Sequence, residues 1–287
     1  MTRVTLLRPL SARPNDGHKG TFGRVLVVGG SATMIGAPAF CGLAAYHAGA
    51  GYVQLATPKE TLLHTLALCP QAIGLALPDD EFEQAIEKAD AVAIGPGLGQ
   101  LADAGDLVDA VLRGGRPTVL DADALNLIAA RGRWPGDVTA RCVFTPHPGE
   151  MKRLGPLFGK TEQSSTDEAD RIDTATRAAS AFGQTIVLKG HRTVVTDGTR
   201  VYVNRTGSPA LAKAGSGDIL SGVLAAMAAQ KNADPFDAAC TAVWLAGTAG
   251  EIAGRRVGER SCMAVDIIAG LGEALSEYER TYGVGTI

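Results

Sequence analysis

The chain has 287 residues, of which 46% are hydrophobic and 20% charged, and its formal net charge is −3. This composition is typical of a globular protein that buries a sizeable core. The slight negative charge argues against a general basic surface for nucleic acid or anionic lipid, although it still allows a local basic site for a small anion. We see no linker, repeat or shift in composition, so we expect a single domain over residues 1–287.

The cysteines and the N-terminal segment indicate the compartment. The five cysteines are scattered and form no C-x-x-C pair, which argues against a disulfide framework or a structural zinc site. The first residues lack the apolar core of a secretory signal. Residues 25–58 carry no Asp, Glu, Lys or Arg, but Gly and Pro interrupt them before any span of about 20 apolar residues is reached. We therefore expect a cytoplasmic protein that does not enter a membrane.

Short β-branched runs alternate with helical segments along the chain. Strands are predicted at 24–28, 52–56, 91–94, 118–120, 142–144 and 185–188, and helices at 37–48, 103–113, 167–182 and 219–230. A hairpin follows the last of these strands, with its turn at Asp197-Gly198. The alternation predicts an α/β fold, with a mostly parallel central sheet and helices on both faces in three αβα layers.

Glycine-rich or polar loops follow these strands. Since crossovers between parallel strands are right-handed, the loops should meet at one edge of the sheet and form one site for a sizeable ligand. They cover residues 29–36, 95–99, 121–126, 145–150, 189–193 and 206–218.

The stretch Gly215-Ser216-Gly217-Asp218 carries the most specific signal. Its glycines let a phosphate approach the free N–H groups at the start of the following helix, and Asp218 is then placed to act as a base on an attacking hydroxyl. The structural alternative is that Asp218 only caps the helix, which contributes about 1 kcal/mol. A cap alone does not require a glycine on each side of Ser216, so phosphate binding is favoured.

Two further loops carry charge to the same edge. In Lys189–Thr193, "KGHRT", Lys189 can neutralise a phosphate and Gly190 opens the backbone, whereas an isolated lysine at a strand end is usually only solvated. In "TPHPGE" two prolines fix the direction of His147, which can bind a substrate or simply belong to a rigid turn.

Other stretches are less specific. In "LDADALN", Asp121 and Asp123 can hold Mg²⁺ or substrate hydroxyls, although Asp123 is equally suited to cap a helix. "GPGLG", residues 95–99, does not match the dinucleotide pattern G-x-G-x-x-G. "GPLFGKT", residues 155–161, looks like a P-loop but lacks the first glycine and a preceding strand, so we expect a surface connection.

Taken together, the motifs closely resemble those of the ADP/ATP-dependent (S)-NAD(P)H-hydrate dehydratases, a family of the ribokinase-like superfamily. The resemblance extends over about residues 19–272. It rests on "KGTFGRVLVVGGS", "GAGYVQLATP", "GPGLGQ", "LDADALNLIA", "TPHPGEMKRL", "VLKGHRTVV" and "NRTGSPALAKAGSGDILSG". Ala214, where many members have glycine, and Tyr52 in place of a common leucine are small departures.

The resemblance implies a ribokinase-like fold and the repair of hydrated NADH and NADPH with ADP, or ATP, and Mg²⁺. Asp218 would be the base at the ring hydroxyl. The implied nucleotide contacts are Lys189, Gly190, His191, Arg192, Thr193, Gly215, Ser216 and Gly217. The implied contacts to the hydrate are Ala37, Gly97, Gly99, His147 and Asp218, with Asp121, Asp123, Asn126 and Glu150 as supporting residues. The metal ligands stay unassigned.

We also expect a homo-oligomer, with a tetramer as the expected size, and no epimerase domain fused ahead of this one, so that an epimerase would be a separate partner. Two other functions agree with the motifs. The first is a ribokinase-like kinase of a small alcohol, and the second is a non-catalytic protein that only binds a nucleotide. A dehydrogenase is disfavoured because the G-x-G-x-x-G pattern is missing.

Overall fold

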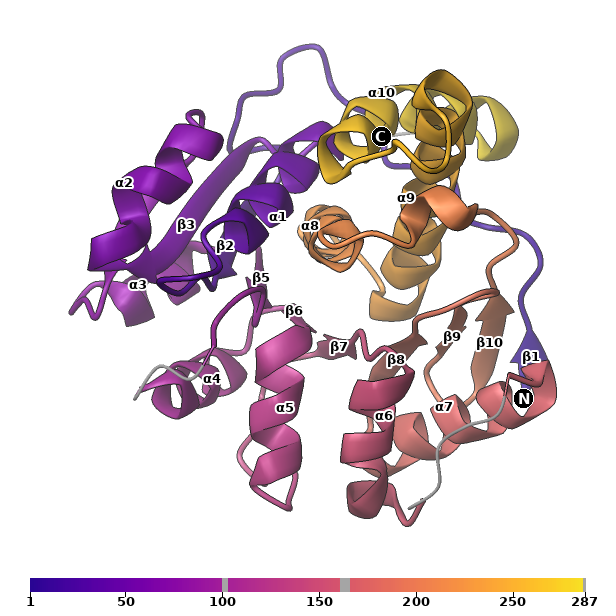
Figure 1. Ribbon diagram of the computed structural model, residues 1–287, viewed down its shortest axis with the longest axis horizontal. Helices are drawn as coiled ribbons and strands as arrows, with labels where there is room; N and C mark the ends of the chain where they lie inside the picture. The colour runs from indigo at the N-terminus through magenta and orange to yellow at the C-terminus, as the bar shows by residue number, and fades with distance from the viewer. Residues whose placement is uncertain (100–102, 161–165, 286–287) are drawn as a thin grey trace.

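The computed structural model describes residues 1–99, 103–160 and 166–285. Its described residues form one sheet of ten strands in the order β1-β10-β9-β8-β7-β6-β5-β2-β3-β4, with helices on both sides (Figure 1). The strands are β1 Thr2–Arg3, β2 Arg24–Val28, β3 Tyr52–Pro58, β4 Ile73–Leu77, β5 Ala91–Ile94, β6 Thr118–Leu120, β7 Cys142–Phe144, β8 Thr185–Leu188, β9 Val194–Thr196 and β10 Arg200–Val203.

The helices complete the three predicted layers. They are α1 Gly36–His47, α2 Lys59–Leu68, α3 Phe82–Lys88, α4 Ala104–Arg113, α5 Ala122–Ala130, α6 Pro148–Leu154, α7 Glu168–Phe182, α8 Ser216–Ala228, α9 Pro235–Val257 and α10 Ala264–Tyr282, with short 3₁₀ turns at Gly155–Phe158 and Pro209–Leu211. Helices α1, α8, α9 and α10 pack together on one face of the sheet, and α3 to α7 cover the other (Figure 1).

The sheet is apolar on both faces, which is why its strands are β-branched runs without polar alternation. In β2, Val25 and Val27 belong to the core beneath α1 and α8, while Leu26 and Val28 belong to the core on the opposite face. The neighbouring strands β8, β7, β6, β5, β2, β3 and β4 are parallel to one another. Strand β9 is antiparallel to both of its neighbours. The predicted parallel sheet and its hairpin are confirmed.

The strand order reverses at β2. The chain runs outward from β2 to β3 and β4, then returns to the other side of β2 and continues through β5, β6, β7 and β8. Loops that leave the carboxyl ends of β2 and β5 therefore diverge and leave a crevice, which is where open α/β sheets bind ligands. Both loops were predicted to belong to the site.

Two smaller observations complete the fold. In the P-loop-like stretch, Gly155–Phe158 form a 3₁₀ turn directly after α6, so the expected surface connection fits there, while Thr161 lies outside the described residues. Among the helices of the described ranges, none is both long and apolar enough to cross a membrane.

Candidate active site

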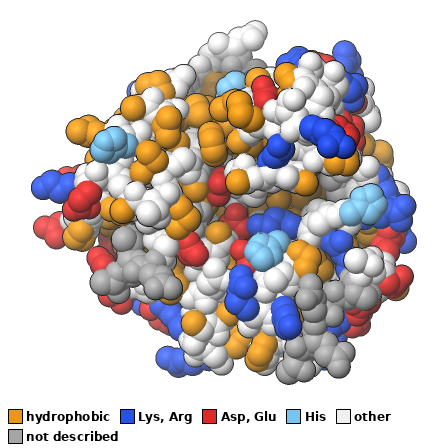
Figure 2. Space-filling model, in the orientation of Figure 1, with side chains coloured by type: hydrophobic (Ala, Val, Ile, Leu, Met, Phe, Trp, Pro, Cys, Tyr) orange, Lys and Arg blue, Asp and Glu red, His pale blue; other side chains and the backbone are white. Residues whose placement is uncertain are grey.

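Charged side chains gather in a hollow on the face of the molecule that contains the carboxyl ends of the parallel strands (Figure 2). At these strand ends the ammonium of Lys189, directly after β8, lies 2.7 Å from the Asp121 carboxylate, directly after β6. Glu150 lies 3.8 Å from the same ammonium. The second oxygen of Asp121 accepts a hydrogen bond from Ser221 on α8, at 2.8 Å. Together these contacts connect the residues that follow β6, β7 and β8 to α8, the helix after the glycine stretch.

Lys189 and Asp121 are both charged at neutral pH and form an ion pair. Asp121 is only 2% exposed, and its burial alone would raise the pKa of the carboxyl, but the adjacent ammonium and its hydrogen bond hold that pKa below its usual value. Burial likewise opposes the charge of Lys189, yet Asp121 and Glu150 raise the pKa of the ammonium above its usual value. A buried charge that is paired in this way is held in one position.

Asp218 has a different environment from the other acids. Burial and the negative charge of Asp121 raise the pKa of the Asp218 carboxyl to about 7; Lys189 lowers it, and Asp123 adds to the rise. Within the described chain its carboxylate has no hydrogen-bond partner. A carboxyl group that is half-buried, unpartnered and titrates near neutral pH has the properties of a general base.

The helix after the glycine stretch begins earlier than the sequence predicts. Helix α8 starts at Ser216, and Gly215 takes the N-cap position with φ +95°. The interpretation of Asp218 as a simple N-cap is therefore wrong, because its residue lies in the first helical turn. The predicted start of the helix at 219 is also wrong. Glycine and serine are poor helix formers, but they still serve at a helix start.

The glycine stretch and the lysine loop do share one edge. A methyl group added at Gly217 would lie 3.5 Å from the Lys189 ammonium and 3.9 Å from Asp121. The free N–H groups at the start of α8 thus lie beside the positive charge of Lys189. Both features favour an anion at this position.

Asp123 and Asn126 have structural partners. The Asp123 carboxylate accepts the N–H of Gly99 at 2.8 Å and the amide of Asn126 at 3.3 Å, and Arg153 donates to Asn126 at 2.9 Å. Asp121, not Asp123, stands at the N-cap position of α5. The interpretation of Asp123 as the cap of α5 is therefore wrong, and its carboxylate instead shapes the GPGLG loop.

The loops after β2 and β5 are in direct contact. The N–H of Gly30 donates to the Pro96 carbonyl at 2.9 Å. A side chain at Gly97 would meet the Met34 carbonyl at 2.8 Å and Ala37 at 3.0 Å, and its φ is +64°. Ala37, Gly97 and Gly99, which were predicted to contact the hydrate, therefore line one wall of the crevice.

His147 caps helix α6. Its Nδ1 accepts the N–H groups of Gly149 and Glu150 at 3.0 and 3.3 Å, and Glu150 in return accepts the N–H of His147 at 2.7 Å. When the imidazole is neutral, its proton is therefore on Nε2. The half-exposed Nε2 lies 3.3 Å from Oε1 of Glu150. The rigid turn is confirmed, and the substrate role of His147 stays a prediction.

Sequence reasoning missed two polar residues at this site, Ser221 and Arg171. Ser221 follows Asp218 by three positions and so shares its helix face. Arg171 lies on α7 in line with the buried positions Thr174, Ala175, Ala178, Ala179 and Phe182. An arginine within such an apolar stripe is the signal that would have revealed it.

The described residues contain no group of three or more His, Cys, Asp or Glu side chains able to hold a metal ion. Magnesium in phosphoryl-transfer sites is usually held by only one or two carboxylates together with substrate phosphates. The carboxylates of the crevice are compatible with an ion of that kind.

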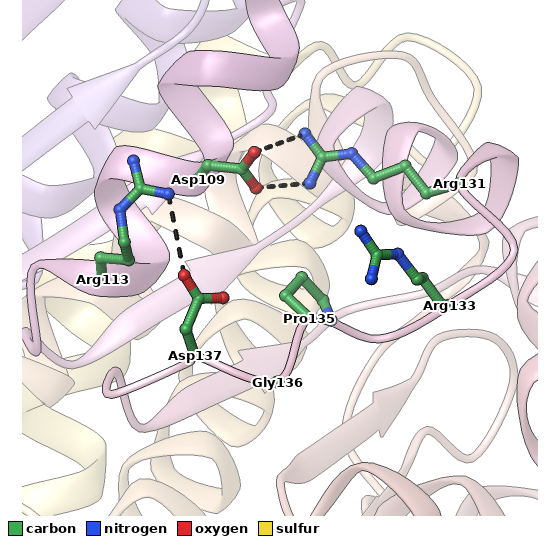
Figure 3. A pocket seen from close by; sticks show the side chains of 7 residues that line it. All are labelled: Asp109, Arg113, Arg131, Arg133, Pro135, Gly136 and Asp137. Atoms are coloured by element: carbon green, nitrogen blue, oxygen red, sulfur yellow. Dashed lines mark hydrogen bonds and ion pairs between the residues drawn. The ribbon is translucent and has the colours of Figure 1, made fainter.

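A second cavity, of about 460 Å³, lies at the opposite edge of the sheet, where Arg113, Arg131 and Arg133 surround it (Figure 3). Arg131 binds both oxygens of Asp109, and Arg113 lies 3.9 Å from Asp137. Arg113 and Arg131 stand at the C-terminal ends of α4 and α5, where cations complement the helix dipole. The fold itself accounts for these charges, and none of the predicted site residues lies there.

Comparison with known proteins agrees with this geometry. The pattern of a protein family described as NAD(P)H-hydrate dehydratase matches residues 25–270. The ADP-dependent (S)-NAD(P)H-hydrate dehydratase of Neisseria meningitidis is 37% identical over 90% of this chain and 85% of its own length. The bifunctional NAD(P)H-hydrate repair enzyme of Moorella thermoacetica is 40% identical over 90% of this chain. The chain spans only about half the length of such bifunctional relatives, 50% in this case.

Solved structures give the same result. A ribokinase-like superfamily protein from Enterococcus faecalis superimposes with a TM-score of 0.82 at 28% identity, over 94% of this chain and 92% of that one. The ADP/ATP-dependent NAD(P)H-hydrate dehydratase of Bacillus subtilis, co-crystallised with ATP and Mg²⁺, gives 0.81 at 30% identity, over 94% and 95% of the two chains. The expected ribokinase-like fold is confirmed. The chain belongs to the NAD(P)H-hydrate dehydratase family.

Proposed function

We propose that this protein catalyses the ADP-dependent dehydration of the S epimer of hydrated NADH and NADPH and thereby restores the reduced cofactor. The observation that carries the proposal is Asp218, whose carboxyl has a pKa of about 7 and lies beside a buried Lys189–Asp121 pair and a glycine-rich helix start. This arrangement provides a base and an anion site next to each other. Family membership supports the ring hydroxyl of the hydrate as the group on which such a base would act.

The reaction follows from these positions. Asp218 accepts the proton of the ring hydroxyl, and the oxygen attacks the terminal phosphorus of the nucleotide. A new O–P bond forms, and the bond from that phosphorus to the bridging oxygen breaks, so that AMP leaves from ADP, or ADP from ATP. The phosphate on the ring then departs with the electrons of the C–O bond. The lone pair of the ring nitrogen assists this departure, and loss of a proton from the neighbouring carbon completes the double bond of the dihydronicotinamide.

The other residues bind and orient. Lys189, the loop through Gly190, His191, Arg192 and Thr193, and the helix start at Gly215, Ser216 and Gly217 would hold the nucleotide phosphates. Ala37, Gly97, Gly99 and His147 would contact the hydrate. Magnesium, carried with the nucleotide, would neutralise phosphate charge. Asp123 is the carboxylate that would hold it, because Asp121 and Glu150 both face Lys189 and Asp218 serves as the base.

The direct test is to incubate the purified protein with hydrated NADPH, Mg²⁺ and either ADP or ATP. We expect the dihydronicotinamide absorbance to return together with release of inorganic phosphate, and Asp218→Asn to lose nearly all of both. A stable phosphorylated product without phosphate release would identify a kinase of a small alcohol instead. Unchanged function in Asp218→Asn would favour a non-catalytic nucleotide-binding protein.

We further propose that the protein is cytoplasmic and forms a homo-oligomer, with a tetramer as the expected size, and that it works with a separate NAD(P)H-hydrate epimerase. An apolar surface on α2 and the edge strand β4 supports self-association: Leu63 is 78%, Leu68 47% and Ile73 45% exposed. The name of the bifunctional repair enzymes, which are about twice as long, supports a second repair activity as a partner.

A further inference from the structure

Arg171, in the first turn of α7, is buried beneath the loop that follows β8. Only 8% of its surface is exposed. One terminal nitrogen of its guanidinium donates to the His191 carbonyl at 2.7 Å, and the other donates to the carbonyls of Leu188 and Lys189 at 3.0 and 3.2 Å. Each of these acceptors is a backbone atom of the end of β8 or of the loop after it.

A guanidinium is costly to bury, and this one has no carboxylate as a hydrogen-bond partner within the described parts of the chain. Its Nε also has no acceptor there. Its hydrogen bonds are therefore all to backbone carbonyl dipoles, and the negative charge of Glu168 adds to the balance of its charge. Only arginine can do this, because its planar fork carries five N–H donors, whereas lysine offers a single point of donation. Because burying a guanidinium costs free energy, we expect Arg171 to have a role beyond packing.

The loop is moulded around the guanidinium. Gly190 has φ +139°, and a methyl group added there would lie 2.9 Å from the nearer nitrogen of Arg171. Arg192 also adopts a positive φ, +56°, which is uncommon for a residue with a side chain. The backbone thus combines a conformation that glycine adopts readily with one that is uncommon for arginine, and its carbonyls turn toward Arg171.

The planar trans peptide bond determines where the N–H groups of this loop point. In each peptide unit the C=O of one residue and the N–H of the next point in opposite directions. Because the carbonyls of Lys189 and His191 point to Arg171, the N–H groups of Gly190 and Arg192 point away from α7. Neither N–H has a backbone or side-chain acceptor among the described residues, so both are available to a ligand.

We propose that Arg171 is a positioning residue that fixes the loop 189–193 so that the N–H groups of Gly190 and Arg192 are presented to the nucleotide. Arg171 does not itself touch the ligand. The inference rests on the proposed nucleotide role of this loop and names the residue that creates its binding geometry.

The test compares Arg171→Met, which keeps an unbranched side chain but removes the charge and the N–H donors, with Arg171→Lys and with the matched control Arg131→Met. Arg131 likewise donates to a backbone carbonyl, that of Gly105 at 2.8 Å, and to a carboxylate, but at the opposite edge of the sheet. For each folded variant we would measure the KM for ADP, the KM for the hydrate, kcat, and amide hydrogen exchange over residues 189–193.

We expect Arg171→Met to raise the KM for ADP at least tenfold and to accelerate amide exchange in the loop, while the KM for the hydrate changes less than twofold. Arg171→Lys should lie between wild type and Arg171→Met, and Arg131→Met should leave all of these quantities unchanged. If Arg171→Met does not fold, Arg171→Lys is compared with wild type by the same measurements.

An unchanged KM for ADP and unchanged loop exchange in a folded Arg171 variant would overturn the inference. Equal losses for ADP and the hydrate would also overturn it, since they would indicate a general structural role. A wild-type protein that uses no nucleotide would instead reject the proposed function, and that result is obtained before any variant is compared.

Discussion

Four carboxylates share the crevice, but only Asp218 combines burial with the absence of a partner. This predicts the pH dependence of the reaction. A base must be deprotonated, so kcat/KM should be low below the pKa of about 7 and should rise to a plateau above it. Asp218→Asn should lower turnover about 10²–10⁴-fold and remove this acidic limb. A pH profile of wild type and variant measures both, and a wild-type limb near pH 4 would contradict the assignment.

The same pKa predicts a cost in stability. The folded state raises the pKa of Asp218 from its ordinary 3.8, so the stability that the protonated carboxyl contributes is complete below about pH 4 and is lost as the pH rises through about 7. Asp218→Asn removes that loss. We expect the inactive variant to be more stable at pH 8 by on the order of 1–2 kcal/mol, allowing for solvent screening, and no more stable at pH 4. Thermal unfolding at the two pH values decides this.

At the residue scale, the sequence identifies which side chains reach the site but not how they pair. Asp121, Glu150, Lys189 and Asp218 each follow a predicted strand or begin a predicted helix, so their common location could be predicted. Whether Lys189 pairs with Asp121 or contacts a phosphate depends on distances of a few ångströms between separate loops. The capping role of His147 could be predicted only in part. The flanking prolines indicate a turn, but not which ring nitrogen accepts the backbone hydrogen bonds.

Helices α1 and α8 approach each other closely at Gly222. A methyl group there would lie 2.0 Å from the Cys41 carbonyl, so Gly222→Ala must push the two helices apart and shift the glycine-rich start of α8. We expect a loss of stability of at least about 1–3 kcal/mol. The matched control is Gly272→Ala in α10, where nothing lies within 4 Å and alanine should instead add about 0.5–1 kcal/mol. Chemical denaturation of both variants is the measurement; equal effects would rule out the close helix contact as the cause.

At the element scale, the interior strands were predictable because burial on both faces leaves only β-branched and apolar residues in them. Strand β4, Ile-Gly-Leu-Ala-Leu, was not predicted: it is an edge strand with glycine and alanine inside it, and its first residue is exposed. The start of α8 was placed three residues too late because glycine and serine have low helix propensity. In both cases tertiary contacts override the local preference.

At the scale of the whole molecule, the site exists because chain segments far apart in sequence meet at the point where the strand order reverses. A ligand that bridges these loops binds only the folded state and therefore stabilises it. With ADP at 100 times its Kd, we expect about 2.7 kcal/mol of added stability, or an increase in Tm of several degrees. Asp218→Asn should retain this shift, since Asp218 acts on the hydroxyl and not on the nucleotide. A shift lost in Asp218→Asn would place Asp218 in nucleotide binding instead.

The apolar surface on α2 and β4 predicts how the molecule assembles. An edge strand with unpaired backbone groups and exposed apolar side chains is prone to associate with another chain, and closed oligomers cover such edges symmetrically. We expect the wild-type protein to sediment as an oligomer and Leu63→Glu to shift it toward smaller species, because a charge at this position would be buried without a partner. Leu6→Glu is the matched control, since Leu6 is 76% exposed, almost as much as Leu63, but lies in the segment before β2.

Sedimentation velocity over a range of concentrations compares the variants. A wild-type monomer at every concentration, or an unchanged mass for Leu63→Glu, would reject this surface as the interface, whereas dissociation by both variants would show that added charge alone is responsible.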